Sequence, residues 1–170
     1  MAERPGIFVR TAGEKDLEAV RTLLVETWHD TYDAIYGADK VAEITGEWHS
    51  LASLRARLTR PHLEFLVADD GLAIAGMAFA VAIDEGATIM LHQLYVRPDK
   101  QRAGTGELLL DEIEASFPEA RRVVLEVEAA NAKGVAFYRK HGFVEAGTST
   151  RTGIPAAGAG TAHRLYEKLL

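Results

Sequence analysis

The sequence predicts an α/β fold of the α+β type, with a mixed, twisted β-sheet of about six to seven strands and helices on both faces. Segments with strand composition alternate along the chain with segments of helical periodicity. Three successive strands are expected in hairpins and helices separate the other strands, which indicates a mixed sheet. A length of 170 residues suits a single domain over residues 1–170 with a substantial core.

The first part of the chain is expected to form a short strand and three helices. The strand is predicted at residues 7–10 and an amphipathic helix at 14–28. A short helix is predicted at 31–36 and a longer one at 44–58. The first helix has an apolar stripe made of Leu17, Val20, Leu24 and Trp28.

Three strands are expected next, at residues 64–68, 73–83 and 88–96. Clusters of Asp and Gly at 69–71 and 84–86 predict the turns between them. The rest of the chain is expected to form strands at 123–128, 143–148 and 163–169, with helices between the earlier ones. A segment rich in Gly and Ala, residues 149–161, separates the last two strands.

Residues 94–110 are the most informative stretch of the chain. Strand residues are followed by a break at Pro98 and Asp99, and then by Gly104 and Gly106, which let a ligand approach the backbone. Helical spacing begins directly afterwards. The first turn of a helix has unpaired N–H groups and a partial positive charge, so this turn suits an anion such as phosphate. Arg102 adds a fixed positive charge.

Two common phosphate-binding motifs are excluded here. A Walker loop fails because Glu107 and Leu108 follow the second glycine, and a dinucleotide fingerprint fails because Leu109 replaces its third glycine. The pattern Gln-x-x-Gly-x-Gly remains, formed by Gln101, Gly104 and Gly106. It resembles the pyrophosphate loop of the GNAT superfamily of acyl-CoA-dependent N-acyltransferases. The alternative is a tight glycine turn without a ligand.

A second motif strengthens the resemblance. After the strand at 123–128, Asn131 is placed to cap a short helix that carries Tyr138 and stops at Gly142, followed by Phe143. This segment is similar to the second GNAT signature. The resemblance covers about residues 63–146, while the N-terminal third matches only in outline.

Composition agrees with an enzyme domain of this kind. The net charge of −6 disfavours a nucleic-acid partner, and no run approaches the ~20 apolar residues of a membrane helix. The first residues lack the apolar region of a signal peptide, and the absence of cysteine is compatible with a reducing cytoplasm, where we expect the protein. The histidines show no metal-binding spacing, so no metal is assigned. A homodimer is compatible with the sequence.

The resemblance implies acetyl-CoA as acyl donor and roles for several residues. Leu94, Tyr95 and Val96 would pair with the pantetheine arm and supply an N–H to the oxyanion. Asn131 would also contact the pantetheine, and Tyr138 would protonate the leaving thiolate; the alternative is that Tyr138 is a core residue. The loop that would hold the pyrophosphate consists of Gln101, Arg102, Ala103, Gly104, Thr105, Gly106 and Glu107.

An amine must lose a proton to attack a thioester, so a base or a water path is needed. Glu126 lies twelve residues before Tyr138, as the proposed base does in the ribosomal-protein N-terminal acetyltransferases that this segment resembles. Glu128 shares the strand face of Glu126, and His92 is a rival base because imidazole titrates near neutrality. A solvated strand carboxylate is the alternative for Glu126.

The acceptor is expected to contact Trp28, Tyr32 and His92. Aromatic faces and the carboxylates Glu26 and Asp30 gather in this part of the sequence, and such groups suit an organic cation. We therefore expect a small cationic primary amine as acceptor; the alternative is that Trp28 and Tyr32 belong to the core. Two other functions stay open: a protein or peptide N-terminal acetyltransferase, and a non-catalytic acyl-CoA-binding module.

Overall fold

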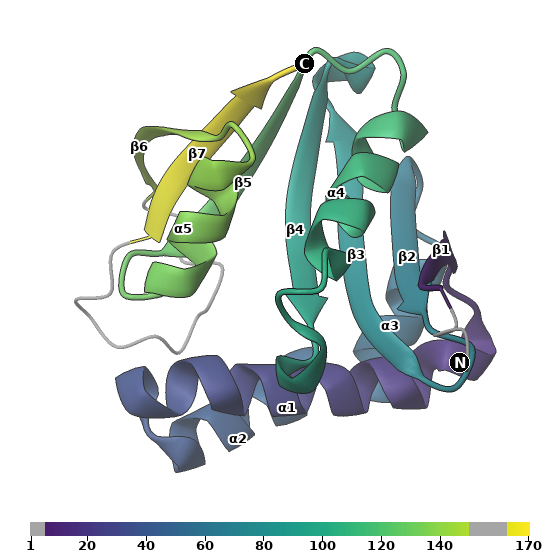
Figure 1. The fold of residues 1–170 in the computed structure, drawn as a ribbon, viewed down its shortest axis with the longest axis vertical. Coiled ribbons are helices and arrows are strands. Elements are labelled where there is room, and N and C mark those ends of the chain that lie inside the picture. The colour runs from purple at the N-terminus through teal and green to yellow at the C-terminus, as the bar shows by residue number, and fades with distance from the viewer. Residues whose placement is uncertain (1–5, 150–162) are drawn as a thin grey trace, which may run out of the picture.

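The computed structural model describes residues 6–149 and 163–170, whose strands form one mixed sheet (Figure 1). The seven strands of these residues are β1 (Phe8–Thr11), β2 (Leu63–Asp69), β3 (Ile74–Ile83), β4 (Thr88–Val96), β5 (Arg122–Glu128), β6 (Val144–Ser149) and β7 (His163–Leu169). Their order is β1-β2-β3-β4-β5-β7-β6, and all neighbours are antiparallel except β4 and β5, which are parallel. The predicted mixed sheet is therefore confirmed.

Helices cover both faces of this sheet, as the sequence predicted. They are α1 (Leu17–Tyr36), α2 (Ala38–Trp48), α3 (Leu51–Leu58), α4 (Thr105–Ser116) and α5 (Ala132–Lys140), with short 3-10 turns at Glu14–Asp16, Asp84–Gly86 and Pro98–Lys100. None of the helices within the described residues is both long enough and apolar enough to cross a membrane.

The two faces of the sheet have separate cores. On one face, side chains of α4 such as Leu109 and Ile113 pack with Ile89 of β4 and Leu125 of β5. On the other face, Val20, Leu23 and Leu24 of α1 and Leu54 of α3 pack with Phe65 of β2 and Phe79 of β3. Because strand residues alternate between the faces, Gln93 and Tyr95 of β4 lie on the α1 side and Leu94 and Val96 on the α4 side.

The first helix is longer than predicted. The expected helices at 14–28 and 31–36 are one continuous helix, α1, because the residues between them contain neither Gly nor Pro. His29 and Asp33 even bridge this region, with 2.7 Å between Nδ1 and Oδ1. The helix ends at Gly37, whose φ of 86° lies in the left-handed region that glycine tolerates.

The prediction of a single helix at 44–58 was also wrong. The structure has two helices there, α2 and α3. Ser50 causes the break, since its side-chain oxygen accepts a hydrogen bond from the Ser53 N–H at 3.2 Å and starts a new helix. His49 precedes it and is completely buried. The strand predictions were correct to within a residue or two. Of the Gly- and Ala-rich segment, residues 150–161 lie outside the described residues.

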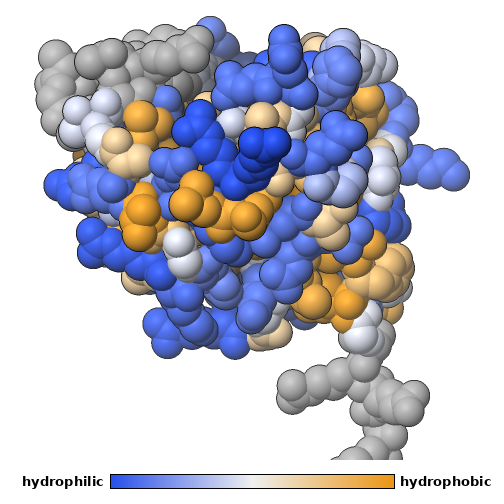
Figure 2. Space-filling model, turned by 90° about the horizontal axis from the view of Figure 1, so that it is seen from above, coloured by the Kyte–Doolittle hydropathy of each residue, from blue (hydrophilic) through white to orange (hydrophobic). Residues whose placement is uncertain are grey.

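The end of the molecule that carries the C terminus is mainly hydrophilic (Figure 2). Its hydrophobic areas are small and separated by polar side chains (Figure 2). Leu169 and Leu170 are among the exposed large hydrophobic residues. Such scattered exposure is ordinary for a protein surface.

Gly76 of β3 allows α4 to pack closely against the sheet. A Cβ atom at this position would lie 3.0 Å from the Tyr95 carbonyl oxygen and 3.0 Å from Leu109 Cδ1. The carbonyl belongs to a strand that is fixed by its hydrogen bonds, so it cannot move aside easily. The absence of a side chain at Gly76 therefore permits the close packing of β3 against Tyr95 and Leu109.

We predict that Gly76→Val lowers the free energy of unfolding by about 1–3 kcal/mol, because the larger side chain overpacks this contact. Gly46→Ala is a matched control, since a Cβ at Gly46 in α2 meets no atom within 4 Å. This control should stabilise the protein by up to about 1 kcal/mol through helix propensity. Urea denaturation measures both values, and unchanged stability in Gly76→Val would contradict the packing argument.

A second prediction concerns pH and His49. Burial and the nearby charge of Arg57 together lower the pKa of His49 to about 3. The folded-state pKa thus lies below the unfolded value of about 6.5, so the unfolded chain binds the proton first as the pH falls. This residue alone should reduce stability by up to about 1.4 kcal/mol per pH unit between about pH 6.5 and pH 3. Denaturation curves of His49→Phe should show a weaker pH dependence; parallel curves would refute the assignment.

Candidate functional site

The parting of β4 and β5 sets the position of the site. Three residue pairs join these strands, and the last is Met90 with Val124. Beyond that pair β4 stays bound to β3 and β5 to β7, so the two strands separate (Figure 1). In the described residues, backbone groups on the β5 side of residues 91–96 have no strand partner. Because such groups need hydrogen bonds, an extended ligand with amide groups can pair with β4 as an added strand.

A bulge in β4 lies at the start of this separation. The β3–β4 register places Phe79 opposite Gln93 and Ala80 opposite Leu91, which leaves His92 as the extra residue. A bulge twists the strand locally and redirects its side chains. His92 keeps an exposed edge beside the Phe79 ring, with centroids 5.7 Å apart. Loss of hydration lowers the pKa of His92 to about 4, helped by the charges of Arg60 and Arg57, so this ring is neutral at pH 7.

The loop after β4 presents backbone donors. Gln101 donates from Nε2 to the Val96 carbonyl oxygen at 3.1 Å, which ties the loop to the strand. Arg102 and Gly104 have φ values of 63° and 83°, and this left-handed geometry turns the chain into α4. The N–H groups in the first turn of α4, at residues 105–107, therefore point out of the helix end.

The loop fits a pyrophosphate group by three observations. Residues 101–104 are exposed, and a Cβ at Gly104 would meet no atom within 4 Å, so the space beside the backbone is open. The hydroxyl oxygen of Thr105 is buried and has no hydrogen-bond partner among the described residues. The end of a helix adds a partial positive charge.

Gly106 also has a packing role. A Cβ at this position would lie 3.0 Å from Cε2 of Phe137, so the absence of a side chain leaves room for the ring of Phe137 in α5. Gly106 thus lets α4 and α5 approach each other beside the opening. Sequence reasoning missed this contact because the two residues are distant in the chain.

Asn131 begins α5 as predicted. Its Oδ1 accepts a hydrogen bond from the Gly134 N–H at 3.0 Å. A Cβ at Gly134 would lie 2.7 Å from Asn131 Nδ2, so only glycine leaves room for this cap. The Asn131 side chain also acts on the phenol of Tyr32, so α1 lies close to the start of α5.

Three phenols meet at the opening. Burial raises the pKa of Tyr138, and the neighbouring phenol of Tyr32 raises it further. Burial also raises the pKa of Tyr32 to about 12 and that of Tyr95 well above its ordinary value. Tyr32 and Tyr138 both act electrostatically on Tyr95. All three hydroxyls therefore keep their protons at neutral pH.

The C-terminal half of α1 contributes an aromatic row. Trp28 and Tyr32 are buried with ring centroids 4.6 Å apart, and Tyr32 stacks on Tyr36 at 5.6 Å. Trp28 and Tyr32 also belong to a small core with Val41 and Ile44 of α2. The two expected acceptor residues are therefore part of the core and also border the opening.

Two carboxylates of β5 lie on the α1 side. Glu126 is half-buried, whereas Glu128 is only 3% exposed. The Tyr36 hydroxyl donates to Glu128 Oε2 at 2.7 Å, and His163 Nε2 lies 3.5 Å from the same oxygen. Glu128 was considered only as an alternative base from the sequence. Its burial and its partners make it the more firmly held carboxylate.

The structure thus brings most of the predicted residues to one place. Residues 94–96, the loop 101–107, Asn131, Tyr138 and the β5 carboxylates all border the opening or its edge. Sequence reasoning missed Tyr36 and His163, and no local pattern marks them. Within the described residues no three His, Asp or Glu side chains gather as a metal site.

Known proteins share this fold. Residues 32–156 match the family model of the acetyltransferase (GNAT) domain. The crystal structure of PaiA N-acetyltransferase from Thermoplasma acidophilum in complex with coenzyme A has a TM-score of 0.85 and 24% identity, covering 97% of this chain and 99% of that chain. Ribosomal-protein-alanine N-acetyltransferase from Brucella melitensis has a TM-score of 0.72 and 25% identity, covering 96% and 99%.

A curated relative is more similar over a shorter stretch. The ribosomal protein bS18-alanine N-acetyltransferase of Salmonella typhimurium is 42% identical over an alignment of 98 residues, which covers 54% of this chain and 60% of that protein. The match therefore spans less than two thirds of the relative.

Proposed function

The chain belongs to the acetyltransferase (GNAT) domain family, and we propose that it transfers an acetyl group from acetyl-CoA to a primary amine. The amine attacks the thioester directly while both substrates are bound. The acceptor is a small cationic amine. We further propose that residues 1–170 form one domain and that the protein works in the cytoplasm, alone or as a homodimer.

The separation of β4 and β5 is the observation that carries this proposal. It leaves residues 91–96 without a strand partner on the β5 side, between the loop 101–104 and Tyr138. Acetyl-CoA has parts that match this order. Its pyrophosphate suits the N–H groups at 105–107, its pantetheine amides suit the backbone of β4, and its thioester then lies near Tyr138.

The proposed chemistry follows from the groups at the opening. Glu126 accepts a proton from the amine, directly or through water. The neutral amine nitrogen attacks the thioester carbon, and a backbone N–H of β4 stabilises the negative oxygen. The C–S bond then breaks, and Tyr138 gives its proton to the leaving thiolate. The second proton on the attacking nitrogen passes through water to the Tyr138 phenolate, which leaves a neutral amide, a thiol and the original phenol, and Glu126 releases its proton to solvent. Holding both substrates in place supplies a large part of the rate gain.

A cationic acceptor is supported by the surroundings of Glu128. Its buried carboxylate lies beside Tyr36 and near Tyr32, so aromatic rings and a negative charge occur together. Such a setting stabilises an ammonium group. A protein N-terminal amine is the second candidate, because the Salmonella and Brucella relatives are named for acetylation of a ribosomal-protein alanine. A non-catalytic acyl-CoA-binding module is the alternative of another class.

An acceptor screen separates these functions. The protein is incubated with acetyl-CoA and a panel of small amines and peptides, and release of free thiol is followed. We expect release with small cationic amines. Turnover restricted to peptides would favour the N-terminal acetyltransferase, and acetyl-CoA binding without any turnover would favour the binding module.

We predict that Tyr138→Phe lowers the turnover rate by roughly 10²–10⁴, because the change removes the proton donor and keeps the ring. The affinity for acetyl-CoA should stay nearly constant in calorimetry, since the ring still packs against Phe137 and Phe143. Wild-type turnover in this variant would show that Tyr138 is only a core residue.

Glu126→Gln should reduce turnover at neutral pH and recover part of it at high pH, where more of the amine is already neutral. Glu128→Gln is the matched variant on the same strand face and should mainly raise the KM for cationic amines. Pre-steady-state and steady-state rates over a pH series distinguish the two effects. Full activity of Glu126→Gln at neutral pH would show that another group or a water path accepts the proton of the amine.

A further inference from the structure

Arg57 of α3 is a half-buried cation at the edge of the opening. Its Nη2 donates to the Trp48 carbonyl oxygen at 2.9 Å, and its Nη1 donates to Oε1 of Gln93 on β4. The guanidinium also lies over the Phe79 ring, 5.7 Å from the centroid. Arg57 therefore connects the end of α2 to the bulged part of β4.

No carboxylate pairs with Arg57 among the residues that the structure describes. Its two protein acceptors are neutral. Burial lowers the pKa of Arg57, because holding an unpaired cation away from water costs free energy. Buried charges are ordinarily paired, so a missing anion is the expected complement of this side chain.

The groups around Arg57 are basic or neutral. The charges of Arg57 and Arg60 both act on His92, and that of Arg57 also acts on His49. His49 is fully buried and neither ring nitrogen has a hydrogen-bond partner in the described residues. This basic region stands out in a chain whose net charge is −6.

The basic region faces the acceptor side of the opening. Gln93 and Tyr95 lie on the α1 side of β4, and the charge of Arg57 acts on the Tyr95 phenol, which in turn is coupled to Tyr138. The carboxylates Glu126 and Glu128 lie on the same side of the sheet, on β5. The opening is thus bordered by positive charge along β4 and by negative charge along β5.

We propose that Arg57, with Arg60 beside it, binds a carboxylate of the acceptor, so that the acceptor carries an anionic group in addition to the reacting amine. This inference rests on the proposed function. It restricts the proposed acceptors to amines that also carry a carboxylate, which are zwitterionic. The ammonium group of the acceptor lies towards the β5 carboxylates, and the acceptor's own carboxylate lies towards α3. Amino acids are the simplest compounds of this class.

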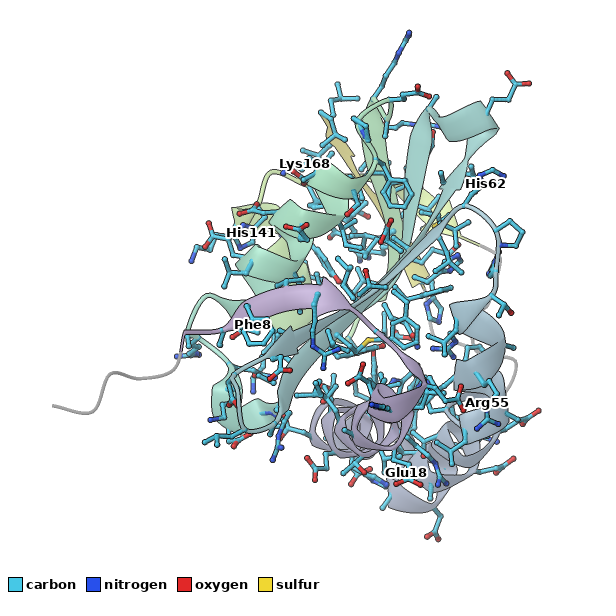
Figure 3. The ribbon with its side chains drawn as sticks, turned by 90° about the vertical axis from the view of Figure 1, so that its right-hand side faces the viewer. Phe8, Glu18, Arg55, His62, His141 and Lys168 are labelled. Carbon is cyan, nitrogen blue, oxygen red and sulfur yellow. The ribbon has the colours of Figure 1, made fainter. Side chains whose placement is uncertain are left out.

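The test uses acceptors that differ in one charge. Glycine, β-alanine and γ-aminobutyrate are each compared with their own carboxamides, which keep the shape and lose the charge. Arg57→Gln removes the guanidinium, and Arg57→Lys keeps the charge. Arg55→Gln is the matched control on the same helix, because Arg55 extends outward from α3 (Figure 3) and pairs with Glu14 at 2.6 Å.

For at least one of the three amino acids, the wild type should show a KM at least about ten-fold lower than for the corresponding carboxamide. Arg57→Gln should abolish this preference, Arg57→Lys should keep part of it, and Arg55→Gln should keep all of it. Calorimetry with coenzyme A bound gives the same comparison without turnover. Melting temperatures report on folding, since a purely structural Arg57 would change them and leave the preference intact.

Equal KM values for carboxylates and carboxamides in the wild type would overturn the subsite, as would a preference that survives in Arg57→Gln. If small amines without a carboxylate are acetylated and amino acids neither react nor bind, the subsite fails and the proposed activity stands. If no amine is acetylated, the proposed activity fails, and the calorimetric comparison still decides whether Arg57 binds a carboxylate.

Discussion

The parting of two parallel strands is the constraint on which the rest of this structure depends. β4 is bound to β3 along its whole length and β5 to β7, yet β4 and β5 share only three residue pairs. The sheet is therefore two half-sheets joined at one end. Backbone groups that are buried or half-buried and lack a hydrogen-bond partner cost free energy. The edge of β4 is therefore suited to a ligand that is itself an extended chain with amide groups. The loop 101–104 and α4 follow directly from that edge, so the N–H groups that we propose for phosphate binding come next in the chain.

Electrostatics divides the opening into regions with different tasks. The helix end at 105–107 suits a strong anion, while the buried phenols of Tyr32, Tyr95 and Tyr138 stay neutral because burial raises their pKa values. On the proposed acceptor side, Glu128 gives negative charge and Arg57 gives positive charge. The three phenols are therefore a neutral group that holds its protons, with charged side chains around it.

Local motifs could be predicted from the sequence, and long-range pairs could not. The strands, the glycine loop and the Asn131 cap depend on neighbours within a few residues, so composition and spacing were sufficient. The helices of the first part were harder, because the break at Ser50 depends on one side-chain hydrogen bond and the continuity of α1 on the absence of any break. The contacts of Tyr36 with Glu128 and of Phe137 with Gly106 exist only after the chain has folded.

This difference also explains why family membership says more about the donor than about the acceptor. The donor side is built from backbone groups and glycines in one short stretch, and backbone donors do not depend on side-chain identity. The proposed acceptor side is built from single side chains on α1, α3, β5 and β7. A change at Arg57 or Glu128 would alter the charge that an acceptor meets, whereas the backbone groups of β4 would remain the same groups. The acceptor must therefore be inferred from the charges and contacts of this chain itself, and those favour a molecule with both an ammonium group and a carboxylate.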